Sequence, residues 1–210
     1  MYNRFQYISQ GRTPEEHLSN CEEVLAAGGK WIQLRMKNFS DEQVEKTAIG
    51  FQSLCASFGA TLIINDNVDL AKKINADGVH LGLTDMPVIK ARLLLGQDKI
   101  IGGTANTLED VIQRIDEGCN YIGLGPFRFT STKEKLSPIL GLEGYQSLIG
   151  KLDEEQRKTP IVAIGGIQLE DISSILATGI SGIALSGILT NSSNTKEIVE
   201  RIHTILYEPA

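Results

Sequence analysis

Two aspartates stand at matching points of a repeated pattern, and their type and spacing suit a metal ion. Asp66 follows the short apolar run 62–64, and Asp85 follows the next such run, 78–81. Runs this short predict buried strands, and helical spacing between them predicts a βαβ unit with parallel neighbouring strands. Both carboxylates should then lie at one end of the sheet, with no lysine nearby to neutralise them, and bind Mg²⁺. The alternative is that each aspartate caps a helix.

Three polar side chains alternate at the end of an earlier predicted strand, 31–35. Gln33, Arg35 and Lys37 should point the same way, because alternate residues of an extended chain share a face. The planar fork of an arginine beside the point charge of a lysine suits a phosphate or diphosphate. Taken alone, this pattern is more often a solvated rim.

Small residues follow the last two predicted strands. Gly165 and Gly166 come after the run 161–164, and Ser186 and Gly187 come after the final run. Glycines there let backbone N–H groups approach a phosphate closely, although they also permit tight turns. The position of these two loops favours phosphate binding.

The elements that must position these side chains repeat along the whole chain. The predicted strands are 5–8, 31–35, 62–64, 78–81, 100–102, 121–124, 161–164 and 182–185. The predicted helices are 13–28, 40–59, 68–75, 86–95, 107–117, 142–152, 169–177 and 195–206. This alternation predicts a single (β/α)₈ TIM barrel over residues 1–210, with its chemistry at the C-terminal ends of the strands. An open doubly wound sheet is the alternative, but even repeats in about the minimum length favour closure.

Composition narrows the class of protein. The 210 residues, 41% of them hydrophobic, suffice for one full core, and a net charge of −6 argues against a general nucleic-acid binder. The N-terminus lacks the apolar segment of a secretion signal, and no run approaches membrane-spanning length, so we expect a cytoplasmic protein without membrane contact. Cys21, Cys55 and Cys119 form no CxxC pair, which favours reduced thiols.

The expected site combines three separable pieces: a cation cluster, a carboxylate pair and a backbone cradle for phosphate. Two anionic groups with a metal beside one of them suggest two small-molecule substrates, one of them a diphosphate. No Ser-His-Asp set, cysteine nucleophile or Schiff-base lysine stands out in the sequence. Metal-assisted transfer of a group from diphosphate is therefore the best chemical fit.

Taken together and in order, these motifs resemble thiamine phosphate synthases over nearly the whole chain. The matching segments are Gln33-x-Arg35-x-Lys37, 64–66, 77–82 with Asp85, Gly125-Pro126 with 130–133, and 160–167. That family joins a hydroxymethylpyrimidine diphosphate to a thiazole phosphate, or its carboxylated precursor, and releases diphosphate. The resemblance implies Mg²⁺ as the cofactor, bound by Asp66 and Asp85. A homo-oligomer is compatible with the sequence, which does not give the oligomeric state.

The resemblance also implies roles for further residues. The pyrimidine diphosphate would be held by Gln33, Leu34, Arg35, Met36, Lys37, Asn65, Thr104 and Lys133. The thiazole phosphate would be held by Thr130, Ser131, Thr132, Gly166, Ser186 and Gly187. Arg35, Lys37 and Lys133 would be catalytic, because they would stabilise the departing diphosphate. The chain departs from the family pattern at Asn106, usually histidine, and at Phe129, usually proline, where Arg128 adds a cation.

Two rival functions stay open. The first is the activity of a thiazole tautomerase, a relative that shares the barrel. That enzyme looks to use a histidine on the loop after the fifth strand as its base. This chain has Asn106 there, which cannot take a proton at neutral pH. A non-catalytic thiamine-precursor binding or regulatory protein would carry the same binding residues, so only turnover separates it from the enzyme.

Overall fold

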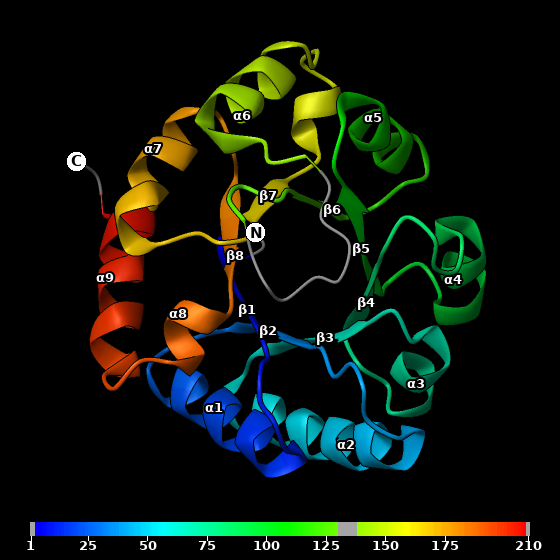
Figure 1. The fold of residues 1–210 in the computed structure, drawn as a ribbon. Coiled ribbons are helices and arrows are strands. Elements are labelled where there is room, and N and C mark those ends of the chain that lie inside the picture. Colours follow the sequence, from blue (N-terminus) through cyan, green and yellow to red (C-terminus); the bar gives the residue numbers. More distant parts are fainter. Residues whose placement is uncertain (1–2, 130–137, 209–210) are drawn as a thin grey trace.

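In the computed structural model, which describes residues 3–129 and 138–208, eight parallel strands close into a barrel and helices cover its outside (Figure 1). Each strand pairs with the next along the chain, and β8 (Gly182–Leu185) pairs with β1 (Phe5–Ile8). The predicted (β/α)₈ barrel is confirmed, and the open doubly wound sheet is wrong.

The elements lie close to their predicted positions. The other strands are β2 (Trp31–Leu34), β3 (Thr61–Asn65), β4 (Gly78–Leu81), β5 (Ile100–Ala105), β6 (Tyr121–Leu124) and β7 (Ile161–Ile164). The helices are α1 (Pro14–Ala26), α2 (Asp41–Phe58), α3 (Val68–Lys73), α4 (Val88–Leu95), α5 (Leu108–Asp116), α6 (Gly141–Gly150), α7 (Ile172–Ala177), α8 (Gly187–Thr190) and α9 (Thr195–Tyr207). Short 3₁₀ turns cover Gln156–Lys158 and Leu169–Asp171.

Local sequence signals explain where the first helices begin and end. The Thr13 hydroxyl accepts a hydrogen bond from the Glu16 N–H at 3.2 Å, and Ser40 forms a capping box with Gln43. Both N-caps were predicted. Gly59 ends α2 in the left-handed region with φ 59°, a conformation that glycine adopts without steric cost.

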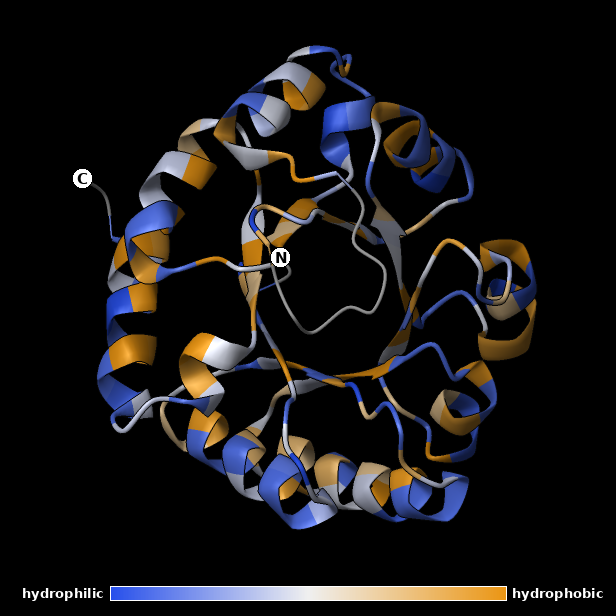
Figure 2. Cartoon of the chain, in the orientation of Figure 1, coloured by the Kyte–Doolittle hydropathy of each residue, from blue (hydrophilic) through white to orange (hydrophobic). Residues whose placement is uncertain are grey.

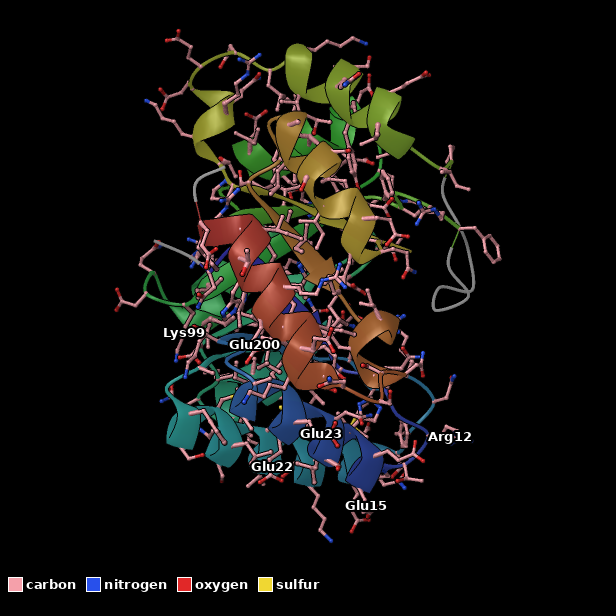
Figure 3. All side chains as sticks on the ribbon, turned by 90° about the vertical axis from the view of Figure 1, so that its left-hand side faces the viewer. Arg12, Glu15, Glu22, Glu23, Lys99 and Glu200 are labelled. Atoms are coloured by element: carbon pink, nitrogen blue, oxygen red, sulfur yellow. The ribbon has the colours of Figure 1, made fainter. Side chains whose placement is uncertain are left out.

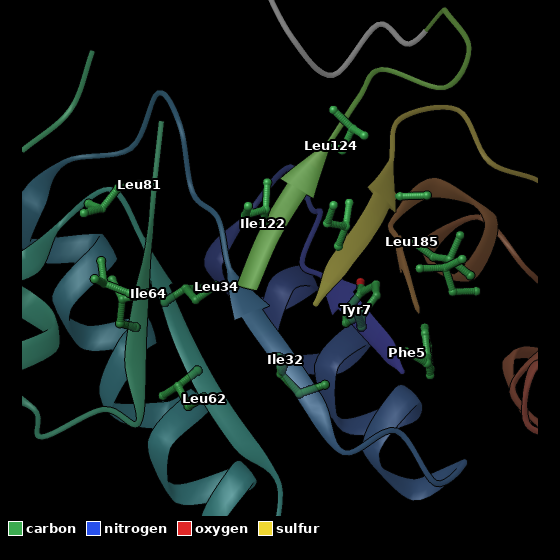
Figure 4. Close-up of a cluster of buried hydrophobic side chains, with 14 of the residues drawn as sticks. Phe5, Tyr7, Ile32, Leu34, Leu62, Ile64, Leu81, Ile122, Leu124 and Leu185 are labelled. Carbon is green, nitrogen blue, oxygen red and sulfur yellow. The ribbon is translucent and has the colours of Figure 1, made fainter. Parts of the chain in front are cut away.

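The strand residues that face outward pack against the helices. Figure 4 shows part of this cluster, including Tyr7, Ile32, Ile64, Leu81 and Leu124. The helices turn much of their hydrophobic surface toward the strands and their hydrophilic surface toward solvent (Figure 2). Charged side chains such as those of Glu15, Glu22 and Glu200 project from the outer surface of α1 and α9 (Figure 3). The main apolar core therefore lies between barrel and helices.

The strand residues that face inward fill the barrel itself. A second apolar cluster consists of Ile8, Trp31, Ile63, Tyr121, Val162 and Ala184. The rings of Trp31 and Tyr121 pack edge to face with centroids 4.7 Å apart. Gly102 makes room for this packing, because an added Cβ there would overlap the Tyr121 ring. The barrel is thus a packed core at this level, as expected for the fold.

Three differences from the sequence prediction lie at the C-terminal side of the barrel, in a strand end or in a helix that follows a strand. β5 continues to Ala105, so Thr104 lies inside the strand instead of after it. α4 begins at Val88, two residues later than predicted. The short helix α8 directly after β8 was not predicted, because four residues are too few to show a helical period. Within the described residues, no helix is long and apolar enough to cross a membrane.

Gly78, the first residue of β4, lies against β5 with no room for a side chain. An added Cβ would overlap the carbonyl oxygen of Ile100 and lie 2.7 Å from the Ile100 Cβ. Gly78→Ala should force the two strands apart and lower the free energy of unfolding by about 1–3 kcal/mol, the usual cost of overpacking. Urea denaturation measures this change.

Gly150→Ala in α6 is the matched control, because an added Cβ there meets nothing within 4 Å. This variant should leave the free energy of unfolding unchanged or raise it by up to about 1 kcal/mol, since alanine favours a helix more than glycine does. Equal losses in the two variants would contradict the close packing of β4 on β5.

Candidate active site

The two predicted carboxylates lie side by side at the C-terminal ends of β3 and β4. Burial, followed by the adjacent carboxyl group of Asp85, raises the pKa of Asp66 to about 6. The Asp85 Oδ2 also accepts a hydrogen bond from the Gly82 N–H at 2.6 Å, which holds it within its own loop. The N-caps of α3 and α4 are Asn67 and Pro87, so the alternative that these aspartates cap helices is wrong.

A lysine does lie beside this pair, so the expectation of no nearby lysine was wrong. Lys37 Nζ is 3.3 Å from Asp66 Oδ2. The expectation considered only residues close in sequence, whereas Lys37 comes from the loop after the neighbouring strand β2. Asn38 and Asp66 have φ angles of 67° and 62°, so both loops turn through the left-handed region where they meet.

The donor set fits a magnesium ion that is held jointly by protein and substrate. Among residues 3–129 and 138–208, no group of three or more His, Cys, Asp or Glu gathers as a complete metal site. Mg²⁺ is commonly bound by one or two carboxylates together with phosphate oxygens and water. Asp66 and Asp85 would supply the protein's share of such a set, and a cation between them would relieve their mutual repulsion.

Below the mouth, a chain of buried polar side chains crosses the barrel. Thr104 Oγ1 lies 3.0 Å from His80 Nε2, and His80 Nδ1 lies 3.0 Å from the Tyr121 hydroxyl. Gln6 Nε2 donates a hydrogen bond to the same hydroxyl at 3.2 Å, and Gln6 Oε1 accepts one from Gln33 Nε2 at 3.2 Å. Gln33 and Thr104, both predicted to hold the pyrimidine, are thus joined through residues to which sequence reasoning gave no role.

A signal for these missed residues was present in the strand alternation. Val79 and Leu81 are apolar and face the helices, so His80 between them must face the barrel interior. The same rule turns Gln6 inward between Phe5 and Tyr7. Polar side chains at inward positions of short apolar strands indicate either a buried network or a binding site.

A cavity of about 500 Å³ opens at the C-terminal ends of the strands, on the side of β7 and β8. It is lined in part by Gly166, Ser186 and Gly187, the described residues predicted to hold the thiazole phosphate. Ser186 Oγ donates a hydrogen bond to Gln10 Oε1 at 3.2 Å, and Gln10 lines the same cavity. These residues come together from loops that are distant in sequence.

The cation cluster is not a separate piece of the site, contrary to the sequence prediction. Arg35 lines the cavity that holds Gly166 and Gly187, whereas Lys37 pairs with Asp66 on the carboxylate side. The two side chains therefore lie in different surroundings, although they are only two residues apart.

The glycines of the cavity differ in why they are needed. Gly165 and Gly166 have φ angles of 99° and 68°, so a tight turn alone accounts for both. Gly187 has no positive φ, and an added Cβ would meet its nearest neighbour, Asn191 Nδ2, at 3.4 Å, an ordinary contact. The tight-turn alternative therefore does not explain Gly187.

The remaining predicted residues of the β2 and β3 ends are divided between the two faces of the barrel. Leu34 and Met36 pack in the outer cluster against the helices, so only their backbone can reach a ligand at the mouth. The Arg35 N–H donates a hydrogen bond to Ser9 Oγ at 3.0 Å, which fixes this part of the chain. Asn65 ends β3 and is partly buried on the inward side.

Arg128 and Asn106, which belong to the departures from the family pattern, connect neighbouring loops. Arg128 donates hydrogen bonds to both carboxylate oxygens of Asp171 and to the Gly166 carbonyl, each at 2.8 Å, so this extra cation ties two loops together. Asn106 Nδ2 donates a hydrogen bond to the Gly125 carbonyl oxygen. Phe129 is 63% exposed and lines the cavity.

Four residues of the predicted site lie outside the described parts of the chain, so their roles stay predictions. They are Thr130, Ser131, Thr132 and Lys133.

The chain is similar to known proteins over nearly its whole length. Residues 6–189 match the family described as thiamine monophosphate synthase. A thiamine-phosphate synthase from Flavobacterium psychrophilum is 56% identical over 203 residues, which cover 97% of this chain and 98% of that protein. Another from Flavobacterium johnsoniae is 52% identical, with 99% and 98% covered. The solved structure of a thiamine phosphate pyrophosphorylase from Pyrococcus furiosus matches with a TM-score of 0.84 and 27% identity, over 98% of this chain and 96% of that one.

Tyr121→Phe tests the buried network. The change removes one hydroxyl and leaves His80 Nδ1 and Gln6 Nε2 without this partner in the barrel interior. The free energy of unfolding should fall by about 1–3 kcal/mol, the cost of unsatisfied buried groups. Urea denaturation gives the value, with Tyr207→Phe as control because Tyr207 is 50% exposed. A loss no larger than that of the control would mean that the network contributes nothing to stability.

Proposed function

We propose a mechanism for this chain, which belongs to the thiamine monophosphate synthase family and makes thiamine phosphate. Diphosphate would leave a hydroxymethylpyrimidine diphosphate with the assistance of Mg²⁺. A thiazole phosphate would then capture the pyrimidine. The carboxylated thiazole precursor is a second candidate for the accepting substrate. The overall reaction is an alkyl transfer that releases diphosphate.

One observation supports the proposed mechanism: two regions of different chemistry lie at one barrel mouth. On one side Lys37 lies 3.3 Å from Asp66, next to Asp85. On the other side Gly166, Ser186 and Gly187 line a cavity of about 500 Å³. A diphosphate with a metal suits the first site, and a phosphate monoester, which needs backbone donors and no metal, suits the second.

The residues of the chain act on binding and on charge. Lys37, Arg35 and Lys133 would hold the diphosphate and stabilise the negative charge that grows on it as the C–O bond breaks. Asp66 and Asp85 would bind Mg²⁺, which when bound supplies further neutralisation of the leaving group. The positive charge would develop at the exocyclic CH₂ of the aminopyrimidine, which the ring can stabilise. No protein nucleophile is needed.

The buried network gives the pyrimidine a floor of fixed polarity. Thr104 and His80 lie at the upper end of this network, 3.0 Å apart, and Gln33 lies at its other end. A ring above them would meet side chains whose orientation is already set by hydrogen bonds. Such preorganisation favours the transition state because no reorientation is needed during bond breaking.

The thiazole pocket would be completed by backbone groups. Gly187, where a tight turn does not explain the glycine, allows a phosphate to approach the chain closely. Arg35 lines this cavity as well, so it lies where both substrates could use its charge. Thr130, Ser131 and Thr132 would contribute hydroxyl groups to the same phosphate.

The rival functions find less support. A tautomerase needs a base on the loop after β5, and Asn106 there donates its amide to the Gly125 carbonyl. A non-catalytic binding protein would carry the same binding residues, but the relatives that the chain matches are thiamine-phosphate synthases. We also propose a cytoplasmic location, contact with small molecules only, and a homo-oligomer whose size light scattering would determine.

Asp66→Asn and Asp85→Asn test the metal assignment. The amide keeps the shape of each side chain but removes a charge that Mg²⁺ needs, so turnover should fall about 100-fold or more, as for other preorganised charge partners. The assay combines both substrates with a Mg²⁺ titration and detects thiamine phosphate. Asp69→Asn, an exposed aspartate on α3, should keep wild-type turnover. Wild-type turnover of both site variants at limiting Mg²⁺ would refute the assignment.

Lys37→Met and Gly187→Val test whether the two substrates use different sites. Lys37→Met should raise KM for the pyrimidine diphosphate about tenfold, the effect of losing one charge-assisted hydrogen bond, and leave KM for the thiazole phosphate unchanged. Gly187→Val should do the reverse, because a larger side chain there crowds Asn191 and Gln10 at the cavity. Equal effects of each variant on both substrates would argue for one shared pocket.

A further inference from the structure

A buried arginine lies directly behind the carboxylate and threonine ends of the site. Arg114 of α5 is only 3% exposed, and its NH1 group lies 2.6 Å from Glu117 Oε2. Removal of a guanidinium from water costs free energy. The Glu117 side chain is 27% exposed, so this ion pair offsets only part of the desolvation cost of Arg114. Arg114 contacts no cavity of the site, and the proposed mechanism does not use it.

The other donors of this guanidinium reach two strand ends. Arg114 Nε donates a hydrogen bond to the Thr104 carbonyl at 3.1 Å, near the end of β5. Arg114 NH2 donates one to the Gly82 carbonyl at 2.9 Å, just after β4. A single planar group thus links the backbones of two neighbouring strands where they leave the barrel.

Each linked residue belongs to the proposed site or holds a side chain of it. Thr104 presents its hydroxyl to His80 at 3.0 Å, on the inward side of the barrel. The Gly82 N–H binds Asp85 Oδ2 at 2.6 Å, on the other side of the same residue that Arg114 holds. The planar guanidinium of Arg114 therefore holds the backbone of Thr104 and the backbone of Gly82, which binds Asp85, at a fixed separation.

The neighbouring sequence leaves room for this arrangement. Gly103 faces outward from β5, and an added Cβ would lie 2.6 Å from Arg114 Cδ and 2.8 Å from Cys119 Sγ. Any larger residue would displace the arginine from the strand. The glycine needs no special φ angle to explain it, so the close approach of the arginine is its structural reason.

We propose that Arg114 is a positioning residue that sets the distance between Asp85 and Thr104, and with it the distance between the metal-bound diphosphate and the pyrimidine ring. The inference rests on the proposed roles of these two residues. A purely packing role would be met by leucine or methionine without a buried charge. Two carbonyl acceptors in different strands require the fixed fork of an arginine, which a lysine does not reproduce.

The chain contains a matched control at the opposite end of the barrel. Arg92 of α4 also links two strands, since it donates hydrogen bonds to the Lys99 carbonyl before β5 and to Asn120 Oδ1 before β6, the latter at 2.6 Å. Arg92 is also a guanidinium that joins the starts of two strands, but its acceptors lie at their N-terminal ends, away from the site. Substitution of Arg92 reports the effect of losing such a link on the fold alone.

The experiment compares Arg114→Lys with Arg92→Lys. Both variants should lower the urea midpoint of unfolding. Arg114→Lys alone should raise KM for the pyrimidine diphosphate about tenfold and leave KM for the thiazole phosphate within about twofold, because the lost hydrogen bond acts on one substrate's site. Calorimetric titration with the pyrimidine diphosphate and no second substrate should give the same rise in Kd. Equal changes for both substrates, or none for either, would reduce Arg114 to a structural residue.

Glu117→Gln gives a second variant that leaves the buried cation in place. It weakens the ion pair that orients the guanidinium, so KM for the pyrimidine diphosphate should rise about two- to fivefold with KM for the thiazole phosphate unchanged. If Arg114→Lys does not fold, a Glu117→Gln enzyme with an unchanged KM for the pyrimidine diphosphate overturns the proposal. Failure of the unmodified protein to form thiamine phosphate would instead refute the proposed function, while calorimetry on the same variants still tests Arg114.

Discussion

The alternation of side chains along strands of a closed barrel is the constraint on which the site depends. Once the barrel closes, every second residue of each strand must be accommodated inside it. At the level of Trp31 and Tyr121 the interior is filled by rings in edge-to-face contact. Beside these rings, polar inward side chains satisfy one another in a network that runs from Gln33 through the Tyr121 hydroxyl to Thr104. The floor of the site is therefore a consequence of barrel packing.

Charges at the mouth are arranged by the order of strands around the barrel. Neighbouring parallel strands bring Lys37, Asp66 and Asp85 from successive loops into one group. The loops after β7 and β8 instead meet around a cavity, and among the described residues that line it Arg35 is the one with a charged side chain. A metal-bound diphosphate and a phosphate monoester differ in charge and in the donors they need. Under the proposed mechanism, the fold would separate the two substrates by binding each at the ends of different strands.

Patterns local in the sequence could be predicted, and contacts between distant residues could not. The strands, the Thr13 and Ser40 caps and the carboxylate pair follow from short-range periodicity and turn residues. The contact of Lys37 with Asp66 depends on how two loops turn, which no spacing encodes. The buried network was overlooked for a different reason. Its members occur singly in apolar strands, and a lone histidine such as His80 carries little signal until the barrel assigns it a face and partners.

The fit between Gly102 and Tyr121 constrains how this protein can change over evolutionary time. A side chain at position 102 would overlap the tyrosine ring, so a substitution there is accessible only after Tyr121 has become smaller. A smaller residue at 121 also removes the hydroxyl shared by His80 and Gln6. The accessible order of change therefore passes through an intermediate that lacks this hydroxyl. Lineages that keep the pyrimidine site should therefore retain both residues, and variation at one should be accompanied by variation at the other.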